Sequence, residues 1–408
     1  MKTYASWLVS VVLLCATPAW SETPNIEEIW AIVQQQQLEI EQLKQQLAVA
    51  DAQLAANDQK IEATGDYLET IVVPAALPTT QISGYGEVHY NNLDAEDSAR
   101  DLEEIDFHRF VLFFGHEFTD RIRFFSELEL EHAVAGDEQP GEVELEQAYV
   151  DLMLSDTLSA KAGLFLLPIG IINETHEPTT FYGVERNSVE TDIIPSTWWE
   201  AGGAMSGHFS SGFSWDVAAH SGLAIPTTGS DAFRVRSGRQ KVAQADADDL
   251  AYTARLRYSG MAGLDLGLSY QYQSDASQVS GDGLDEGQLL VVNASYNLGA
   301  FTLKGVYADW NFSGAAIEAA GADSQTGWYL EPSYRLTTTR GDWGIYVRYQ
   351  DVSAARTQDQ FTQNEIGVNY WPTEKVVVKF DLRQRDHDLT SEMGRDFDGF
   401  DLGLGYQF

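Results

Sequence analysis

Basic residues recur at alternate positions within short apolar segments of this chain. Arg255 and Arg257 flank Leu256, and Arg348 follows Val347. Successive side chains of an extended strand point to opposite faces, so the bases share one face and the apolar side chains share the other. On a face in contact with water, such fixed cations can form ion pairs with acids, attract anions or contribute to an electric field. The ten members of this set, called the basic wall below, are Arg121, Arg123, Lys161, Arg255, Arg257, Lys304, Arg335, Arg348, Lys379 and Arg383.

The long connector 168–197 carries a second charged set of opposite sign. Its charged and titratable residues are Glu174, His176, Glu177, Glu185, Arg186, Glu190 and Asp192. Five acids against one arginine would favour cations wherever this segment borders a solute path. The alternative is an external loop whose charges are solvated in the ordinary way.

Signals for catalysis or for a bound cofactor are weak. The chain lacks the HExxH, P-loop and nucleophile-elbow motifs. His89, His108, His116 and His132 are scattered along the sequence, and GDGLDEG at 281–287 lacks the full ligand spacing of a calcium loop. The sequence therefore predicts no enzyme, no cofactor and no metal site.

Segments with a period of two fill the chain from Gln81 onward. About sixteen strands are expected, an even number as in closed outer-membrane barrels. Short and long connectors alternate between them, which is typical of turns on one rim and loops on the other. The expected strands are 81–90, 106–118, 121–132, 142–154, 158–167, 198–209, 213–220, 250–259, 264–273, 288–297, 301–310, 326–336, 343–351, 362–371, 375–385 and 399–408.

The alternation itself favours a transmembrane barrel over a soluble sheet. A basic side chain on the lipid face at mid-depth costs about 2–4 kcal/mol, whereas on the inner face it meets water. The final strand, FDLGLGYQF, alternates apolar with small or polar residues and ends on Phe408. Two strands fit poorly: FHRFVLFFGHEF is apolar on both faces, and Pro332 requires a bulge or a missing ladder bond.

The first 80 residues predict three further segments. Residues 1–21 resemble a secretory signal peptide that ends in the small-x-small site Ala19-Trp20-Ser21 and contains the only cysteine, Cys15. Residues 22–73 predict a periplasmic α-helical coiled coil, because apolar residues recur every seven positions from Ile26 to Leu68. The alternative for these heptads is one long helix packed on its own domain. Residues 74–80 form a proline-broken linker, and residues 81–408 form the barrel.

The segment AGLFLLPIGIINETHEPTTFYGVERNSV resembles the phosphate-selective porin O and P family. The resemblance lies in a G-x-F strand, a P-x-G turn and a later E-R pair. Here these are Gly163, Phe165, Pro168, Gly170, Glu185 and Arg186. It covers about residues 81–408 and implies a trimeric sixteen-strand channel whose loop 168–197 folds inward. The coiled coil instead resembles the periplasmic extension of some sugar porins. The acids of the loop depart from the basic constriction of the phosphate-selective family.

These features predict an outer-membrane porin for passive diffusion of small hydrophilic solutes or ions. An anion- or phosphate-selective channel is the first alternative. A structural or adhesive barrel that contacts the cell wall is the second. The expected partners are outer-membrane lipid and lipopolysaccharide, two further copies in a homotrimer, and possible cell-wall contact through the periplasmic rod. A net charge of −37 argues against nucleic acid.

Charge selectivity depends on which set lies nearest the narrowest point. If the loop folds inward, its five acids lie there, so weak cation preference or near neutrality is expected. The basic wall could also be structural, with its bases paired to Glu127, Glu129, Asp265, Glu331 and Asp381. A further cluster, FRVRSGRQK with Arg234, Arg236, Arg239 and Lys241, lies in the long loop 221–249. It could recruit anions, bind lipopolysaccharide phosphates or pair with neighbouring acidic loops.

Overall fold

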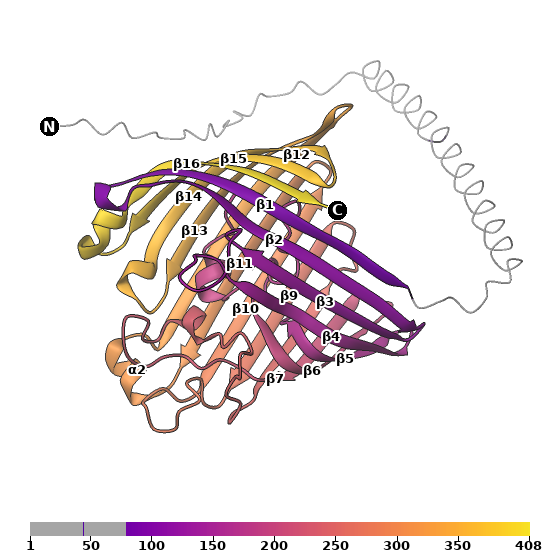
Figure 1. Cartoon of the computed structure of the whole chain (residues 1–408), viewed down its shortest axis with the longest axis horizontal. Coiled ribbons are helices and arrows are strands. Elements are labelled where there is room, and N and C mark those ends of the chain that lie inside the picture. Colours follow the sequence, from indigo (N-terminus) through magenta and orange to yellow (C-terminus); the bar gives the residue numbers. More distant parts are fainter. Residues whose placement is uncertain (1–43, 45–78) are drawn as a thin grey trace, which may run out of the picture. The chain divides into compact units, whose positions relative to one another are not determined.

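The chain forms a closed barrel in which every strand is antiparallel to its neighbours in sequence. The computed structural model describes residue 44 and residues 79–408. The expected signal peptide, the coiled coil and nearly all of the linker therefore lie outside the described residues. Strand β1 (Thr80–Ala95) closes the ring against β16 (Phe397–Gln407), with Tyr85 opposite Gln407 and Ala95 opposite Phe397 (Figure 1).

Sixteen strands make up the barrel, as the period-two pattern predicts, so the fold class of the barrel is confirmed. The remaining strands are β2 (Leu102–Thr119), β3 (Ile122–Glu131), β4 (Val143–Ser155), β5 (Leu158–Leu166), β6 (Trp199–His208), β7 (Phe213–His220), β8 (Ala251–Tyr258), β9 (Leu264–Gln273), β10 (Gly287–Leu298), β11 (Phe301–Phe312), β12 (Ser324–Thr338), β13 (Gly341–Ser353), β14 (Gln360–Thr373) and β15 (Val376–His387).

Within residues 79–408, short helices occur only between strands. They are α2 (Ala315–Ala320), the π-helical turn η2 (Val189–Ile193) and the 3-10 turns η1 (Ser98–Arg100), η3 (Val235–Gly238), η4 (Thr357–Asp359) and η5 (Thr390–Arg395). Among the described residues, we find no helix with the length and apolar character needed to cross a membrane.

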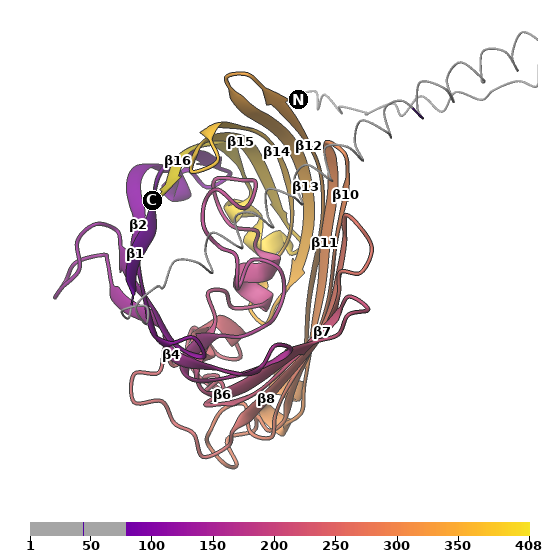
Figure 2. The same ribbon diagram turned by 90° about the vertical axis from the view of Figure 1, so that its right-hand side faces the viewer.

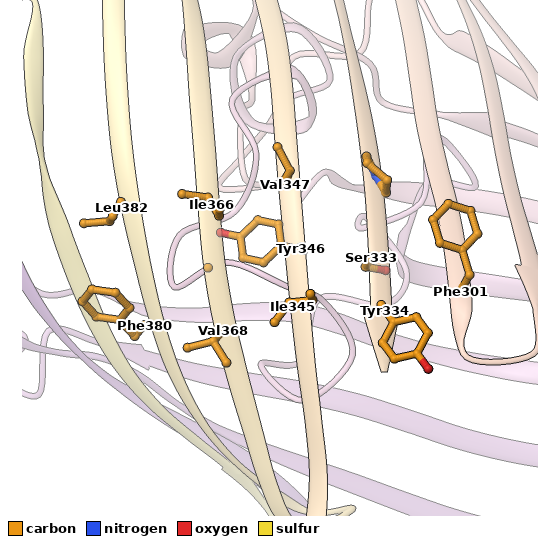
Figure 3. A pocket seen from close by; sticks show the side chains of 12 residues that line it. Phe301, Ser333, Tyr334, Ile345, Tyr346, Val347, Ile366, Val368, Phe380 and Leu382 are labelled. Carbon is orange, nitrogen blue, oxygen red and sulfur yellow. The ribbon is translucent and has the colours of Figure 1, made fainter. Parts of the chain in front are cut away.

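The outer face of the barrel is apolar and the inner face is mostly polar. Figure 3 shows a shallow groove on the outer face of β11–β15, where Ile345, Val347, Ile366 and Leu382 project from neighbouring strands. Val347 is 48% exposed, whereas Arg348, the next residue, is 1% exposed and lies on the inner side. A face of this kind suits contact with lipid, because apolar side chains are stable in lipid whereas charged side chains there cost free energy.

The two irregular strands have local explanations. Where β12 pairs with β13, Leu330 opposes Tyr349 and Ser333 opposes Tyr346, with no pairs between them, so Pro332 leaves a gap in the ladder without changing the register. The expected missing ladder bond at this proline is confirmed. In β2 the register against β1 shifts between Glu87 and His89, which marks a bulge that changes which side chains face inward.

The apolar core lies inside the barrel, between the wall and two inserted loops. Ile193 and Trp198 of the loop after β5 pack in one buried cluster with Leu223 of the loop after β7 and with Leu289 and Trp310 of the wall. Burial of these side chains fixes the loops against β10–β14 by the ordinary hydrophobic gain of about 25 cal/mol per Å².

Candidate functional site: a charged constriction

The loop between β5 and β6 lies within the ring of strands (Figure 2). Asn173 bridges the two ends of this loop. Its side-chain amide donates to the carbonyls of Leu167 and Trp198 at 2.8 and 3.0 Å. The Asn173 side-chain oxygen also accepts the Trp198 backbone N–H at 2.6 Å. One side chain thus joins the two ends of a segment of about thirty residues, which holds the loop in one arrangement.

Wall residues from distant strands bind the backbone of this loop. Lys379 donates to the Gly183 carbonyl at 2.7 Å, and Asp381 accepts the Val184 N–H at 2.7 Å. Trp310 donates its indole N–H to the Ile193 carbonyl at 2.8 Å. These bonds satisfy backbone groups of an irregular segment that would otherwise be buried without partners.

Glycines on the inner face of β16 provide room for the loop. A side chain at Gly403 would begin 3.1 Å from a Val184 methyl carbon, and one at Gly405 would overlap the Pro178 ring. The outward positions between them, Leu402 and Leu404, are exposed. The alternation in FDLGLGYQF therefore has two causes: a lipid-facing row of large side chains and an inner row small enough for the loop.

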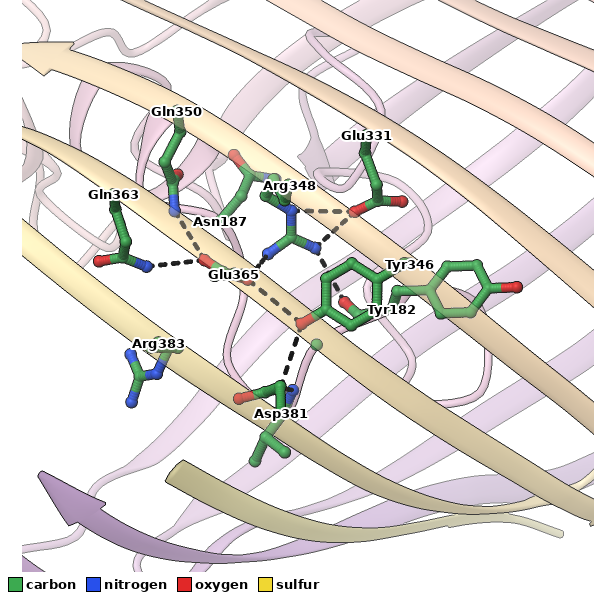
Figure 4. Close-up of polar contacts among 12 residues, drawn as sticks. Tyr182, Asn187, Glu331, Tyr346, Arg348, Gln350, Gln363, Glu365, Asp381 and Arg383 are labelled. Atoms are coloured by element: carbon green, nitrogen blue, oxygen red, sulfur yellow. Dashed lines mark hydrogen bonds and ion pairs between the residues drawn. The ribbon is translucent and has the colours of Figure 1, made fainter. Parts of the chain in front are cut away.

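An ion-pair network under the loop is centred on Arg348 (Figure 4). Its guanidinium contacts the Glu331 and Glu365 carboxylates at 2.6 Å each and donates to the Tyr182 carbonyl at 3.0 Å. Gln350 donates to the second Glu365 oxygen at 2.7 Å. All of these wall side chains are buried, so the network links the loop directly to β12, β13 and β14.

Most acids of the loop are occupied by partners. Glu174 pairs with Arg255, and Glu185 accepts from His89 at 3.0 Å. Glu190 accepts the backbone N–H groups of Ile171 and Ile172 at 2.6 and 2.8 Å. Burial by itself raises the pKa of the Glu185 carboxyl, but the adjacent His89 outweighs it, so the pKa lies well below its usual range. The loop acids are therefore less available to passing cations than a count of charges implies.

The last charged residues of the loop set face different surroundings. Asp192 lies 3.8 Å from the Arg234 guanidinium, and Glu177 is partly exposed. His176 is buried against Glu127 of β3. Arg186 has two guanidinium nitrogens that are buried without a hydrogen-bond partner.

The basic cluster of loop 221–249 also reaches the constriction loop. Arg236 donates to the Thr191 and Ser196 carbonyls at 3.1 and 2.6 Å, and Arg239 donates to the Thr197 carbonyl at 2.5 Å. Burial lowers the pKa of Arg236 to about 9, which leaves its charge intact at neutral pH. Lys241 instead pairs with Glu142 and Glu144 near the long-loop end of β4. Of the roles left open by the sequence, pairing with neighbouring acids applies to Arg234 and Lys241.

Side chains of both loops and of the β1–β4 wall enclose a cavity of about 390 Å³. Arg186, Arg236 and Arg239 line it, and among the described residues none of the three forms an ion pair with a carboxylate. Glu131, Glu142 and Glu144 line it as well. Three guanidinium groups that no carboxylate neutralises by direct contact therefore line the cavity together with these acids.

The residues of the basic wall differ in how deeply they are buried. Arg348 and Lys379 are buried under the loop, and Arg383 pairs there with the buried Asp401. Arg255 pairs with Asp216 at 2.8 Å as well as with Glu174. Arg255, Arg348 and Lys379 thus contact groups of the loop, and Arg383 joins β15 to β16, so all four bases are held by protein groups.

The other wall bases lie farther from the loop anchors. Arg257 pairs with Asp265, and Arg335 pairs with Asp342 at 3.0 Å. Lys161 lies over the Phe165 ring at 4.8 Å. Arg121 and Arg123 are exposed beside the short β2–β3 turn, and Lys304 is half-buried. Of the acids named as possible partners, Asp265 and Glu331 do pair with wall bases, whereas Glu127 contacts His176.

Two basic residues that face the lumen are missing from the basic wall predicted from the sequence. Arg385 donates to the Ser188 hydroxyl at 3.1 Å. It lies at the end of the expected strand 375–385 with the same parity as Arg383, so the alternation alone would have placed it on the inner face. Arg109 contacts Glu87 at 2.7 Å from a strand that reads as apolar on both faces. The bulge in β2 interrupts the parity there, and no simple pattern in the sequence marks it.

Comparison with known proteins indicates the family of this chain. The model of the Gram-negative porin family matches residues 218–390. An uncharacterised protein of Aquifex aeolicus (strain VF5) is 34% identical over 354 residues, which span 75% of this chain and 76% of that protein. The chain belongs to the Gram-negative porins.

Solved structures similar to this porin agree in fold. The anion-selective porin from Comamonas acidovorans is 12% identical, with 81% of this chain and 100% of that chain covered and a TM-score of 0.57. The channel DcaP of Acinetobacter baumannii is 12% identical, with 82% and 98% covered and a TM-score of 0.52. The trimer form of OmpT of Vibrio cholerae is 9% identical, with 81% and 99% covered and a TM-score of 0.50.

Family and fold together identify the activity at the level of the barrel. This porin forms an outer-membrane channel through which solutes diffuse passively. Barrels of about sixteen strands are wide enough to leave an aqueous path, and here the two inserted loops narrow it. The particular match to the phosphate-selective porins is not found among these comparisons.

Proposed function

We propose that the channel prefers anions at its constriction. The observation that carries this proposal is the set of three guanidinium groups, Arg186, Arg236 and Arg239, which line one cavity without carboxylate partners. From the sequence alone, weak cation preference or near neutrality is expected, because all five loop acids count as free. The partners of Glu174, Glu185 and Glu190 remove most of that negative charge from the solute path.

Charges at the narrowest point outweigh those elsewhere. Screening falls off over a Debye length of about 8 Å at physiological ionic strength, so the strongly acidic outer loops act weakly on an ion inside the constriction. Arginine in a confined, poorly solvated site attracts small anions, including phosphate, through fixed hydrogen-bond donors. Two likenesses point in the same direction: the resemblance to the phosphate-selective porins, and the similar fold of the anion-selective porin from Comamonas acidovorans.

Zero-current potentials across a salt gradient test this proposal in planar bilayers. Wild-type channels should show anion preference. The triple variant Arg186→Gln/Arg236→Gln/Arg239→Gln should shift several-fold toward cations in its permeability ratio. Arg121→Gln/Arg123→Gln is the matched control, because these bases are exposed beside a short turn, and it should leave the ratio unchanged.

Three results would contradict the proposal or narrow it. A wild-type channel that prefers cations would reject it, and a barrel without conductance would support a purely anchoring role. Block of the wild-type current by micromolar phosphate, absent in the triple variant, would extend the proposal from anions in general to phosphate.

We also propose that the porin assembles as a homotrimer with help from residues 22–73. The support is the heptad row from Ile26 to Leu68, together with the trimer form recorded for OmpT of Vibrio cholerae. Chemical cross-linking of the full-length protein in membranes should yield a trimer. Ile40→Asp/Leu47→Asp, which places charge in the expected seam, should deplete it. Gln45→Asp/Ala52→Asp adds the same charge at outer heptad positions and should leave the trimer intact. Equal depletion by both pairs would reject the seam.

A further inference from the structure

Two glutamates and a histidine converge on one point behind the constriction loop. The Nε2 atom of His176 lies 3.2 Å from a Glu127 oxygen and 3.6 Å from a Glu146 oxygen. All three side chains are at most 3% exposed. Glu127 comes from β3, Glu146 from β4 and His176 from the loop, so only the folded barrel brings them together.

Each of the three groups is oriented by a second partner. The Glu127 oxygen that faces away from the cluster accepts from Gln147 at 2.6 Å, and the outer Glu146 oxygen accepts from Thr197 at 2.5 Å. The Nδ1 atom of His176 lies 3.2 Å from the Asn173 carbonyl. A carbonyl only accepts, so Nδ1 carries a proton and donates it. In this tautomer Nε2 carries the lone pair, which is aimed at two carboxylate oxygens.

Acceptors that face one another in a buried site require a proton or a metal cation between them. The inner Glu146 oxygen has no hydrogen-bond partner. The Tyr85 hydroxyl is a second such group, and its ring centre lies 6.0 Å from that of His176. Buried polar atoms in native proteins are nearly always satisfied, so a cluster of orphaned ones indicates a missing ligand.

The spacing identifies the class of that ligand. A tetrahedral zinc ion with ligand bonds of about 2.0–2.2 Å separates its ligand atoms by about 3.3–3.5 Å, close to the two distances measured here. Imidazole together with carboxylates suits a divalent transition metal better than Mg²⁺ or Ca²⁺, which select oxygen ligands. Outer partners on both carboxylates and on the far nitrogen of the histidine are the usual surroundings of metal ligands.

We propose that Glu127, Glu146 and His176 bind a divalent transition-metal ion, for which Zn²⁺ is the probe. The ion joins β3 and β4 to the constriction loop on the side opposite the Arg348 network. It therefore fastens the loop at both walls of the barrel. The site holds an ion outside the 390 Å³ cavity, so it goes beyond the proposed anion preference and does not depend on it.

Isothermal titration calorimetry with purified full-length protein tests the site directly. The protein must carry no histidine tag, and cysteine cannot compete if the signal segment with Cys15 is removed. Wild type should bind one Zn²⁺ per chain and should not bind Mg²⁺ at the same concentration. Loss of a group that merely supports a metal ligand already lowers affinity about 10–100-fold, so Glu146→Gln and His176→Gln should each lower it by at least about tenfold.

The matched control is Glu174→Gln. It removes a carboxylate from the same loop but outside the cluster, and it should leave zinc affinity unchanged. As a second measurement, Zn²⁺ should raise the apparent midpoint of thermal unfolding of wild type, because a ligand that binds only the folded state stabilises it. Zn²⁺ should leave the midpoint of Glu146→Gln unchanged.

The outcomes separate clearly. Absence of zinc binding by wild type at 100 µM would overturn the proposal and would assign the site to a proton shared among the carboxylates. Equal affinity in wild type and Glu146→Gln would also overturn it. If Glu146→Gln fails to assemble, His176→Gln gives the same comparison from the loop, away from the strands. None of these results bears on the zero-current potentials, so failure here leaves the selectivity proposal standing.

Discussion

Arg348→Met is expected to lower the free energy of unfolding by about 3–5 kcal/mol, the usual cost of removing one partner from a buried ion pair. Methionine fills a similar length but leaves the Glu331 and Glu365 carboxylates buried without their cation. The Tyr182 carbonyl also loses its donor, so the loop should loosen on that side. Urea unfolding in lipid vesicles, followed by tryptophan fluorescence, measures the change.

A matched substitution at Arg257 provides the control for this result. Arg257 on β8 also belongs to the basic wall, but its side chain is 48% exposed. It pairs with Asp265, and water reaches this ion pair. Surface ion pairs contribute about 0–1 kcal/mol, so Arg257→Met should have a small effect. If the two variants lose equal stability, the Arg348 network does not anchor the fold as argued. Addition of Glu331→Gln and Glu365→Gln to Arg348→Met should recover part of the loss, because it removes the unpaired charges.

Excision of residues 175–195, replaced by a short glycine–serine linker, is expected to raise single-channel conductance at least about twofold. The excised segment lies within the ring of strands, and a sixteen-strand barrel without it leaves a wider aqueous path (Figure 2). The cut keeps Asn173, which joins the two ends of the loop. Anion preference should fall at the same time, since Arg186 is removed and Arg236 loses one of its two carbonyl acceptors. Planar-bilayer recording measures both quantities.

Shortening of the β3–β4 loop is the control for this excision. Residues 136–140 are exposed, and Ala135 and Gly141 on either side of them already form a β-bridge, so their removal should disturb little. Conductance of this second variant should match that of wild type. An unchanged conductance after excision of 175–195 would mean that the loop does not narrow the solute path.

Much of the barrel could be predicted because its information is local. Alternation such as Arg255-Leu256-Arg257 reports two environments on either side of a strand, and each strand carries its own copy of that signal. Strands β7 (Phe213–His220) and β9 (Leu264–Gln273) have the predicted bounds, and the other strands differ from prediction only at their ends. Irregularities were foreseeable where a residue type forces them, as at Pro332, but not at the β2 bulge, which no residue type dictates.

The sequence also predicted that the loop 168–197 folds into the barrel, but it did not show how the charges of this loop are paired. Counting charges in 168–197 predicted an acidic constriction, yet Glu174 and Glu185 are paired with Arg255 and His89. The basic cluster around Arg236, for which the sequence left three roles open, instead donates to carbonyls of the constriction loop. The net charge at a constriction is the charge that ion pairs leave unneutralised. These pairs depend on contacts between segments that are distant in the sequence.

By itself, then, the sequence determined the membrane-type barrel, its strand order and the two chemically different faces of each strand, because these follow from a period of two and from the lengths of the connectors. Only the tertiary structure decided which charges remain free. His176 meets Glu127 across 49 residues, and Arg348 meets the Tyr182 carbonyl across 166. Such pairs leave no periodic trace in the chain. They form because a closed barrel confines its inserted loops, so that most buried polar groups of a loop find their partners on whichever wall lies opposite.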